Sequence, residues 1–120
     1  MVINQGDLFW IKIKLEEPLS SSSANRHPYV VVQNNVFNSS KINTIVVCAL
    51  SYNTKLAAVP GNVFLGTTEA NLGAESVVNI SQIFTVSKEQ LGEKFGTLSP
   101  NIVRQIIEGV KLLLTPNEIE

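Results

Sequence analysis

Apolar and polar residues alternate near the start of the chain with the period of two that is typical of a β-strand. Within residues 8–15, Phe9, Ile11, Ile13 and Leu15 share one parity, which predicts a strand with one fully apolar face. Further strands are predicted at 28–33, 43–50, 62–65 and 76–86, the last of them bent near 81–82. Short strands joined by turns at this spacing favour a small barrel over an open parallel sheet.

The segment 16–25 interrupts this pattern with polar residues, among them four consecutive serines at 20–23. Such a stretch is too polar to join a core, so we expect an exposed loop. It is either a tolerated surface insertion or a lid over a site.

Helical periodicity is confined to the last third of the chain. Ser87 and Gln90 have the spacing of a capping box, which predicts a short helix there. A final helix is predicted to begin at Ser99-Pro100 and to end at Thr115-Pro116. Its apolar stripe is broad enough to pack on the strands and still leave area for a partner subunit. The stripe consists of Ile102, Val103, Ile106, Ile107, Val110, Leu113 and Leu114.

The 120 residues fit a single domain, 1–120, with one core. No apolar run approaches a membrane span and the first residues lack a secretory signal, so we expect a cytoplasmic protein without a membrane partner. Cys48 is the only cysteine and lies in an apolar run, which predicts a buried, inert thiol. The formal net charge of −1 carries no global signature of nucleic-acid binding, although the half before Pro60 is the more basic one.

Several classes of chemistry are poorly supported. His27 is the only histidine and Asp7 the only aspartate, so we expect no metal site. The glycines stand singly between predicted elements, which argues against ATP, NAD and acyl-transfer chemistry and hence against a cofactor.

Cleavage of RNA makes smaller demands, because the 2′-hydroxyl beside each phosphodiester supplies the nucleophile. A protein then needs only to align that hydroxyl and to stabilise the charge of the transition state. Arg26, at a loop–strand junction, and Ser51, at the end of the third predicted strand, could do so. Each also has an ordinary interpretation, as a solvated charge and as a turn residue.

The order and spacing of six motifs closely resemble the MazF/PemK family of type II toxins, from about Gly6 to Leu114. The motifs are Gly6-Asp7-Leu8-Phe9-Trp10-Ile11, Arg26-His27-Pro28-Tyr29-Val30-Val31-Val32-Gln33-Asn34, Val46-Val47-Cys48-Ala49-Leu50-Ser51, Ser76-Val77-Val78, Gln82-Ile83-Phe84-Thr85-Val86 and Glu93-Lys94-Phe95-Gly96-Thr97-Leu98-Ser99. The resemblance implies an SH3-like barrel with a C-terminal helix that forms a homodimer. It also implies a metal-independent, sequence-specific endoribonuclease that cuts single-stranded mRNA and leaves 2′,3′-cyclic phosphate and 5′-hydroxyl ends. A cognate antitoxin with an acidic, flexible tail would occupy the RNA groove.

The resemblance places catalysis at Arg26 and Ser51, where the family has an arginine before a proline and a threonine at the end of a strand. We expect the RNA contacts to include Ser22, His27, Asn53 and Gln82.

The chain departs from the family pattern at three places. Serines replace the glycines of the first loop, His27 separates Arg26 from Pro28, and Phe84 stands where the family usually has an arginine. Arginine is a poor general base, so the group that accepts the proton is not evident. His27 carries a basic imidazole, but strand alternation would point it away from Arg26.

Two alternative functions fit the same fold. A CcdB-like toxin would keep the fold and inhibit DNA gyrase, although the end of the chain offers no aromatic anchor. A catalytically weakened module would bind RNA or antitoxin through the same groove without cutting.

Overall fold

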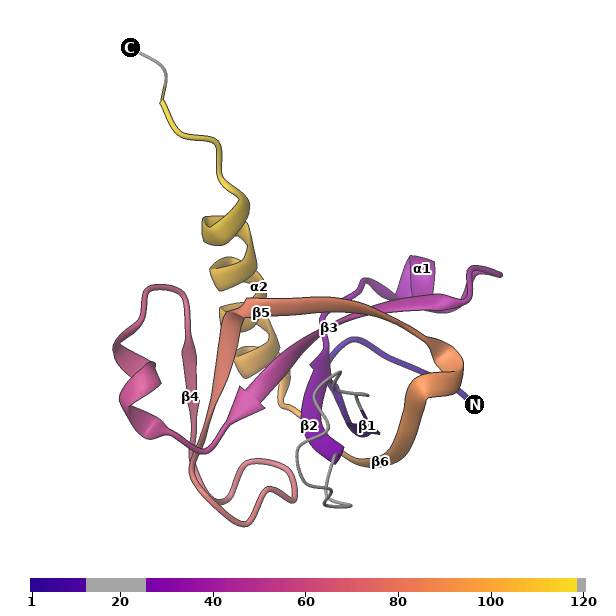
Figure 1. The fold of residues 1–120 in the computed structure, drawn as a ribbon, viewed down its shortest axis with the longest axis horizontal. Helices are drawn as coiled ribbons and strands as arrows, with labels where there is room; N and C mark the ends of the chain where they lie inside the picture. Colours follow the sequence, from indigo (N-terminus) through magenta and orange to yellow (C-terminus); the bar gives the residue numbers. More distant parts are fainter. Residues whose placement is uncertain (13–25, 119–120) are drawn as a thin grey trace, which may run out of the picture.

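The computed structural model describes residues 1–12 and 26–118, and it consists mainly of one antiparallel sheet with a C-terminal helix (Figure 1). The strands are β1 (Asp7–Lys12), β2 (Arg26–Val31), β3 (Thr44–Ser51), β4 (Val63–Leu65), β5 (Ser76–Ser87) and β6 (Leu91–Thr97). The helices are α1 (Asn35–Asn38) and α2 (Pro100–Leu114), with 3₁₀ turns η1 (Thr54–Ala58) and η2 (Lys88–Gln90). The predicted strands at 28–33, 43–50, 62–65 and 76–86 are confirmed within two residues at each end. Of the strand predicted at 8–15, the described part is confirmed as β1.

The six strands lie in the order β4-β5-β3-β2-β1-β6, and within the described chain β4 and β6 are the two ends of the sheet. The expected closed barrel is therefore corrected to a curved, open sheet (Figure 1). β4 has only three residues, and it is the loop after β4, not β4 itself, that contacts β6. In that loop the Asn71 side chain donates to the Phe95 carbonyl at 2.9 Å, and Ala70 packs so close that a Cβ on Gly96 would lie 2.9 Å from its Cβ.

Strand alternation divides the buried residues into two clusters, one on each face of the sheet. The first contains Leu8, Val30, Cys48 and Val78, and α2 packs on it through the fully buried Ile106. The second consists of Ile3, Phe9, Ile11, Tyr29, Val31, Ile45, Val47, Val86 and Leu91.

β5 bends where the sequence predicts it. Cys48 pairs with Ile83 while its neighbour Ala49 pairs with Asn79, so three residues of β5 bulge out between consecutive partners on β3. The bulge turns Gln82 toward the end of β3, where a cavity opens.

The segment after β5 differs from the sequence prediction. The short helix predicted after Ser87 is the single turn η2, in which Gln90 Oε1 accepts a hydrogen bond from the Ser87 amide at 2.8 Å. The chain then continues as β6, which the sequence analysis did not predict. Glycines weaken the strand pattern in this segment. Glycine is needed at position 92 because a Cβ there would lie 2.6 Å from the Trp10 carbonyl oxygen.

The final helix is confirmed from cap to end. The Ser99 hydroxyl accepts a hydrogen bond from the Ile102 amide, Pro100 occupies the first turn, and Thr115 follows the last helical residue. At its far end α2 extends beyond the sheet (Figure 1). In the described part of the chain, no helix combines the length and the apolar character needed to cross a membrane.

Cys48 is fully buried, and burial raises the pKa of its thiol to about 12. Because only the thiolate reacts readily, the native protein is expected not to react with a disulfide reagent such as Ellman's reagent at pH 8. After unfolding in guanidinium, one thiol per chain is expected to react. Rapid labelling of the native protein would contradict this placement.

Candidate functional site

A cavity of about 480 Å³ opens where β2 begins and β3 ends, beside the bulge of β5. It is lined by His27, Tyr29, Ala49, Leu50, Ser51, Asn79, Gln82 and Phe84. Three of the residues that the sequence analysis singled out, His27, Ser51 and Gln82, therefore lie in one cavity although they come from three strands.

The pairing of β2 with β3 explains why His27 and Ser51 share this cavity. Tyr29 pairs with Ala49, and continuing the antiparallel register by two residues aligns His27 with Ser51. Side chains two residues apart on a strand share a face, so His27 and Tyr29 point the same way as Ser51 and Ala49.

Ser51 is half-buried, and its hydroxyl oxygen accepts a hydrogen bond from the Asn53 amide at 3.1 Å. A hydroxyl carries one donor besides its acceptor lone pairs, so this contact fixes the oxygen and leaves the proton able to donate. Ser51 can thus offer a hydrogen bond to an anion bound in the cavity.

Asn79 lines the cavity but was not predicted as a site residue. Its side-chain oxygen accepts from Asn62 Nδ2 at 3.3 Å, and Asn62 in turn accepts from the Ile80 amide at 2.9 Å. These bonds hold the Asn79 amide beside Gln82, which is exposed on the bulge. The available signal in the sequence was one polar residue within the apolar run 77–80.

Two aromatic rings border the same space. Tyr29 and Phe84 meet edge to face with ring centroids 6.1 Å apart, and Phe84 remains 39% exposed. Burial raises the pKa of the Tyr29 phenol, so it remains protonated at neutral pH. The exposed ring of Phe84 provides an apolar surface on which a base could stack.

Arg26 lies outside this cavity. Its guanidinium carbon is 4.6 Å from the centre of the Trp10 ring, and Trp10 stacks on Phe95 at 4.7 Å. Arg26, Trp10 and Lys12 line a separate cavity of about 330 Å³. The structure thus brings His27, and not Arg26, beside Ser51, because alternate residues of β2 point to opposite faces.

Asn53, another predicted RNA contact, does not line this cavity. Its side chain caps η1 by accepting a hydrogen bond from the Lys55 amide at 3.2 Å, and its backbone amide donates to the Ser51 hydroxyl. Ser22 and the rest of the polar loop that contains it lie outside the described residues.

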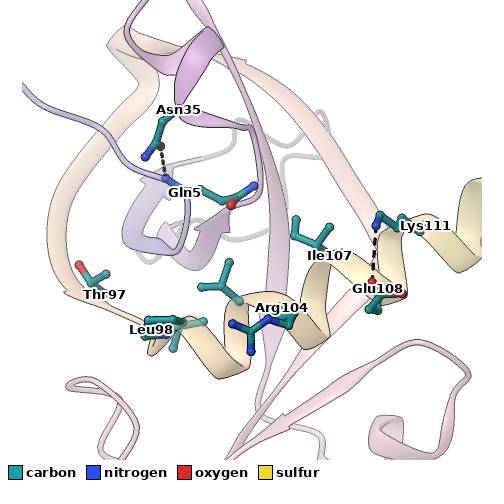
Figure 2. A pocket seen from close by; sticks show the side chains of 10 residues that line it. Gln5, Asn35, Thr97, Leu98, Arg104, Ile107, Glu108 and Lys111 are labelled. Carbon is teal, nitrogen blue, oxygen red and sulfur yellow. Dashed lines mark hydrogen bonds and ion pairs between the residues drawn. The ribbon is translucent and has the colours of Figure 1, made fainter.

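A further cavity, of about 550 Å³, lies beside α2 and is shown in Figure 2. Its charged side chains include Glu108 and Lys111, which pair with each other at 3.5 Å. The hydroxyl of Thr97 at its rim donates to Asp7 at 2.8 Å. None of the described residues predicted for RNA binding or catalysis lines this cavity.

Comparisons with known proteins agree with this architecture. The model of the family described as PemK-like, MazF-like toxin of type II toxin-antitoxin system matches residues 4–114. The chain is 34% identical to endoribonuclease MazF6 of Mycobacterium tuberculosis strain H37Rv, covering 95% of this chain and 98% of that protein. It is 24% identical to endoribonuclease EndoA of Bacillus subtilis, over 95% and 96% of the two chains. A crystal structure of MazE-MazF from Deinococcus radiodurans aligns with a TM-score of 0.74 at 18% identity, covering 98% of this chain and all of that one. This chain therefore belongs to the family of PemK-like, MazF-like toxins of type II toxin-antitoxin systems.

Proposed function

We propose that this protein is an endoribonuclease toxin that cuts single-stranded mRNA in the cytoplasm without a metal ion. The observation that carries this proposal is the cavity in which Ser51, His27 and Gln82 converge. Support also comes from its relatives in M. tuberculosis and B. subtilis, which are named endoribonucleases.

The arrangement suits a reaction in which the 2′-hydroxyl of RNA attacks the neighbouring phosphorus. Ser51 would donate a hydrogen bond to a phosphate oxygen and so stabilise the charge that grows there in the transition state. Gln82 and Asn79 would add neutral amide donors, and Phe84 would stack on a base next to the cleaved bond. The products would be a 2′,3′-cyclic phosphate and a 5′-hydroxyl.

We propose that Arg26 binds a phosphate of the RNA backbone. Arg26 and His27 are the exposed first two residues of β2, and their side chains point to opposite faces. The planar fork of a guanidinium is suited to phosphate oxygens. Because the Trp10 ring supports it outside the cavity, we propose that it grips the backbone beside the cleaved phosphate.

The partners proposed for this groove are RNA and a cognate antitoxin. Solved relatives include a MazE-MazF complex from D. radiodurans and a mycobacterial endoribonuclease with its cognate antitoxin. We propose that the antitoxin of this chain lays an acidic, flexible tail over the cavity and so competes with RNA.

We propose that two chains form a homodimer through the far end of α2. Leu112, Leu113 and Leu114 are all more than 40% exposed there, which is unusual for three consecutive leucines. Leu113→Glu is expected to convert a dimer into a monomer in sedimentation velocity, because a charge cannot be buried unpaired in an apolar interface. Gln105→Glu, at an exposed polar position of α2, is the control and is expected to stay dimeric. An unchanged dimer of Leu113→Glu would contradict this interface.

Incubation of the purified protein with a long RNA in excess chelator tests the proposed activity. Discrete fragments with 2′,3′-cyclic phosphate and 5′-hydroxyl ends are expected. Intact RNA that nevertheless binds the protein would instead indicate a module without catalysis. Inhibition of gyrase supercoiling by the same preparation, with RNA left intact, would indicate the gyrase-directed alternative.

A further inference from the structure

His27 lines the cavity together with Ser51, whereas its neighbour Arg26 is turned toward Trp10. Attack by a 2′-hydroxyl needs a group that accepts its proton, and a guanidinium with a pKa above about 12 does this poorly.

The other side chains that line the cavity cannot accept a proton near neutral pH. Ser51 offers a hydroxyl, Asn79 and Gln82 offer amides, and the buried Tyr29 phenol has a raised pKa and stays protonated. His27 alone among these lining residues carries a basic nitrogen. Histidine is also the side chain whose charge ordinarily changes between about pH 5 and 8.

We propose that His27 is the general base of the cleavage reaction and accepts the proton of the attacking 2′-hydroxyl. This inference rests on the proposed ribonuclease function and specifies its mechanism. As the proton moves to an imidazole nitrogen, the 2′-oxygen forms its bond to phosphorus. The bond from phosphorus to the 5′-oxygen then breaks, and that oxygen takes a proton from solvent. The imidazolium afterwards releases its proton to water, so the enzyme returns to its starting state.

In the described part of the chain, the imidazole of His27 lies among uncharged side chains. The groups around it are Ile11 opposite it on β1, Tyr29 on β2, Ala49 and Ser51 on β3, and Asn79, Gln82 and Phe84 on β5. Among these described residues there is no carboxylate and no amine. Lys12 and Arg26, one rung further along β1 and β2, line the separate cavity beside Trp10.

The test compares wild type with His27→Gln in single-turnover cleavage of an RNA oligonucleotide between pH 5 and 9. The wild-type rate is expected to fall about tenfold per pH unit on the acid side, as the base becomes protonated. His27→Gln is expected to be about 100-fold slower at neutral pH and to lose this acid limb. Because His27 is exposed, its replacement is expected to leave the melting temperature unchanged.

Arg26→Gln is the matched control, since it alters the adjacent residue on the opposite face of the strand. It is expected to weaken RNA binding and to keep the acid limb. If Arg26→Gln abolishes the limb, or if His27→Gln is slow with the limb intact, His27 is not the base.

A substrate with a sulfur atom in place of the bridging 5′-oxygen distinguishes a base that acts on the 2′-hydroxyl from an acid that acts on the leaving group. A thiolate leaves without needing a proton, so a variant that lacks a general acid regains its rate on this substrate. His27→Gln is expected to remain about 100-fold slower than wild type on it. Recovery to the wild-type rate would show that His27 acts on the leaving group and would overturn the assignment.

The outcomes also distinguish this inference from the function on which it rests. If wild type leaves every RNA intact, the proposed ribonuclease activity fails. If wild type cleaves and His27→Gln shows the same rate and pH profile, the activity stands and the role of His27 falls.

Discussion

Replacement of Ser51 by alanine is expected to slow RNA cleavage by about 100-fold or more without unfolding the protein. The hydroxyl is held at the cavity by the Asn53 amide, and its proton is the donor that we place on the phosphate. Loss of one such donor removes stabilisation that exists mainly in the transition state, so kcat is expected to fall more than KM rises. Cleavage followed on a labelled oligonucleotide measures both.

Two variants serve as controls for Ser51→Ala. Ser51→Thr retains a hydroxyl and is expected to keep most of the activity. Ser40→Ala removes a serine hydroxyl that donates to the Phe37 carbonyl in the turn after α1, remote from the cavity, and is expected to cleave at the wild-type rate. Full activity of Ser51→Ala would remove Ser51 from the mechanism.

Asp7→Ala is expected to lower the free energy of unfolding by about 3 kcal/mol. The Asp7 carboxylate is 1% exposed and accepts hydrogen bonds at 2.8 Å from both the Asn4 amide and the Thr97 hydroxyl. These bonds tie the N-terminal turn to the end of β6. Urea denaturation followed by circular dichroism measures the change.

Lys94 Nζ lies 3.2 Å from the same carboxylate, which is buried, while the Lys94 side chain is 41% exposed. Because the ammonium is partly solvated and the carboxylate keeps its two hydrogen bonds without it, Lys94→Met is expected to cost less than Asp7→Ala. A larger loss in Lys94→Met than in Asp7→Ala would show that the ion pair, and not the pair of hydrogen bonds, stabilises this corner.

The sequence predicted β1 to β5, because the apolar residues of these strands record burial. β3 and the bend of β5 are clear examples. β6 escaped prediction because its shape depends on contacts with other strands: Gly92 is needed for a close approach to Trp10, which no local pattern reveals. Whether the sheet closes into a barrel was also not predictable, because closure depends on whether the three-residue β4 extends far enough to pair with the other end of the sheet.

The candidate site was predicted in part. Alternation alone indicated that Arg26 and His27 point to opposite faces, but not which face holds the cavity. That depends on the bulge between Asn79 and Ile83, which sets where β5 meets the end of β3. Asn79 was missed for the same reason, since its role follows from pairing with Ala49 and not from its sequence neighbours.

In the proposed mechanism, RNA supplies its own nucleophile within the cavity of Ser51 and His27. An oligoribonucleotide with a single deoxyribose at the nucleotide 5′ to the cleaved bond tests this step. We predict that this oligonucleotide stays intact, while one with the deoxyribose a nucleotide further away is cut at the normal rate. Equal cutting of both would show that water or another group, and not the 2′-hydroxyl, attacks the phosphorus.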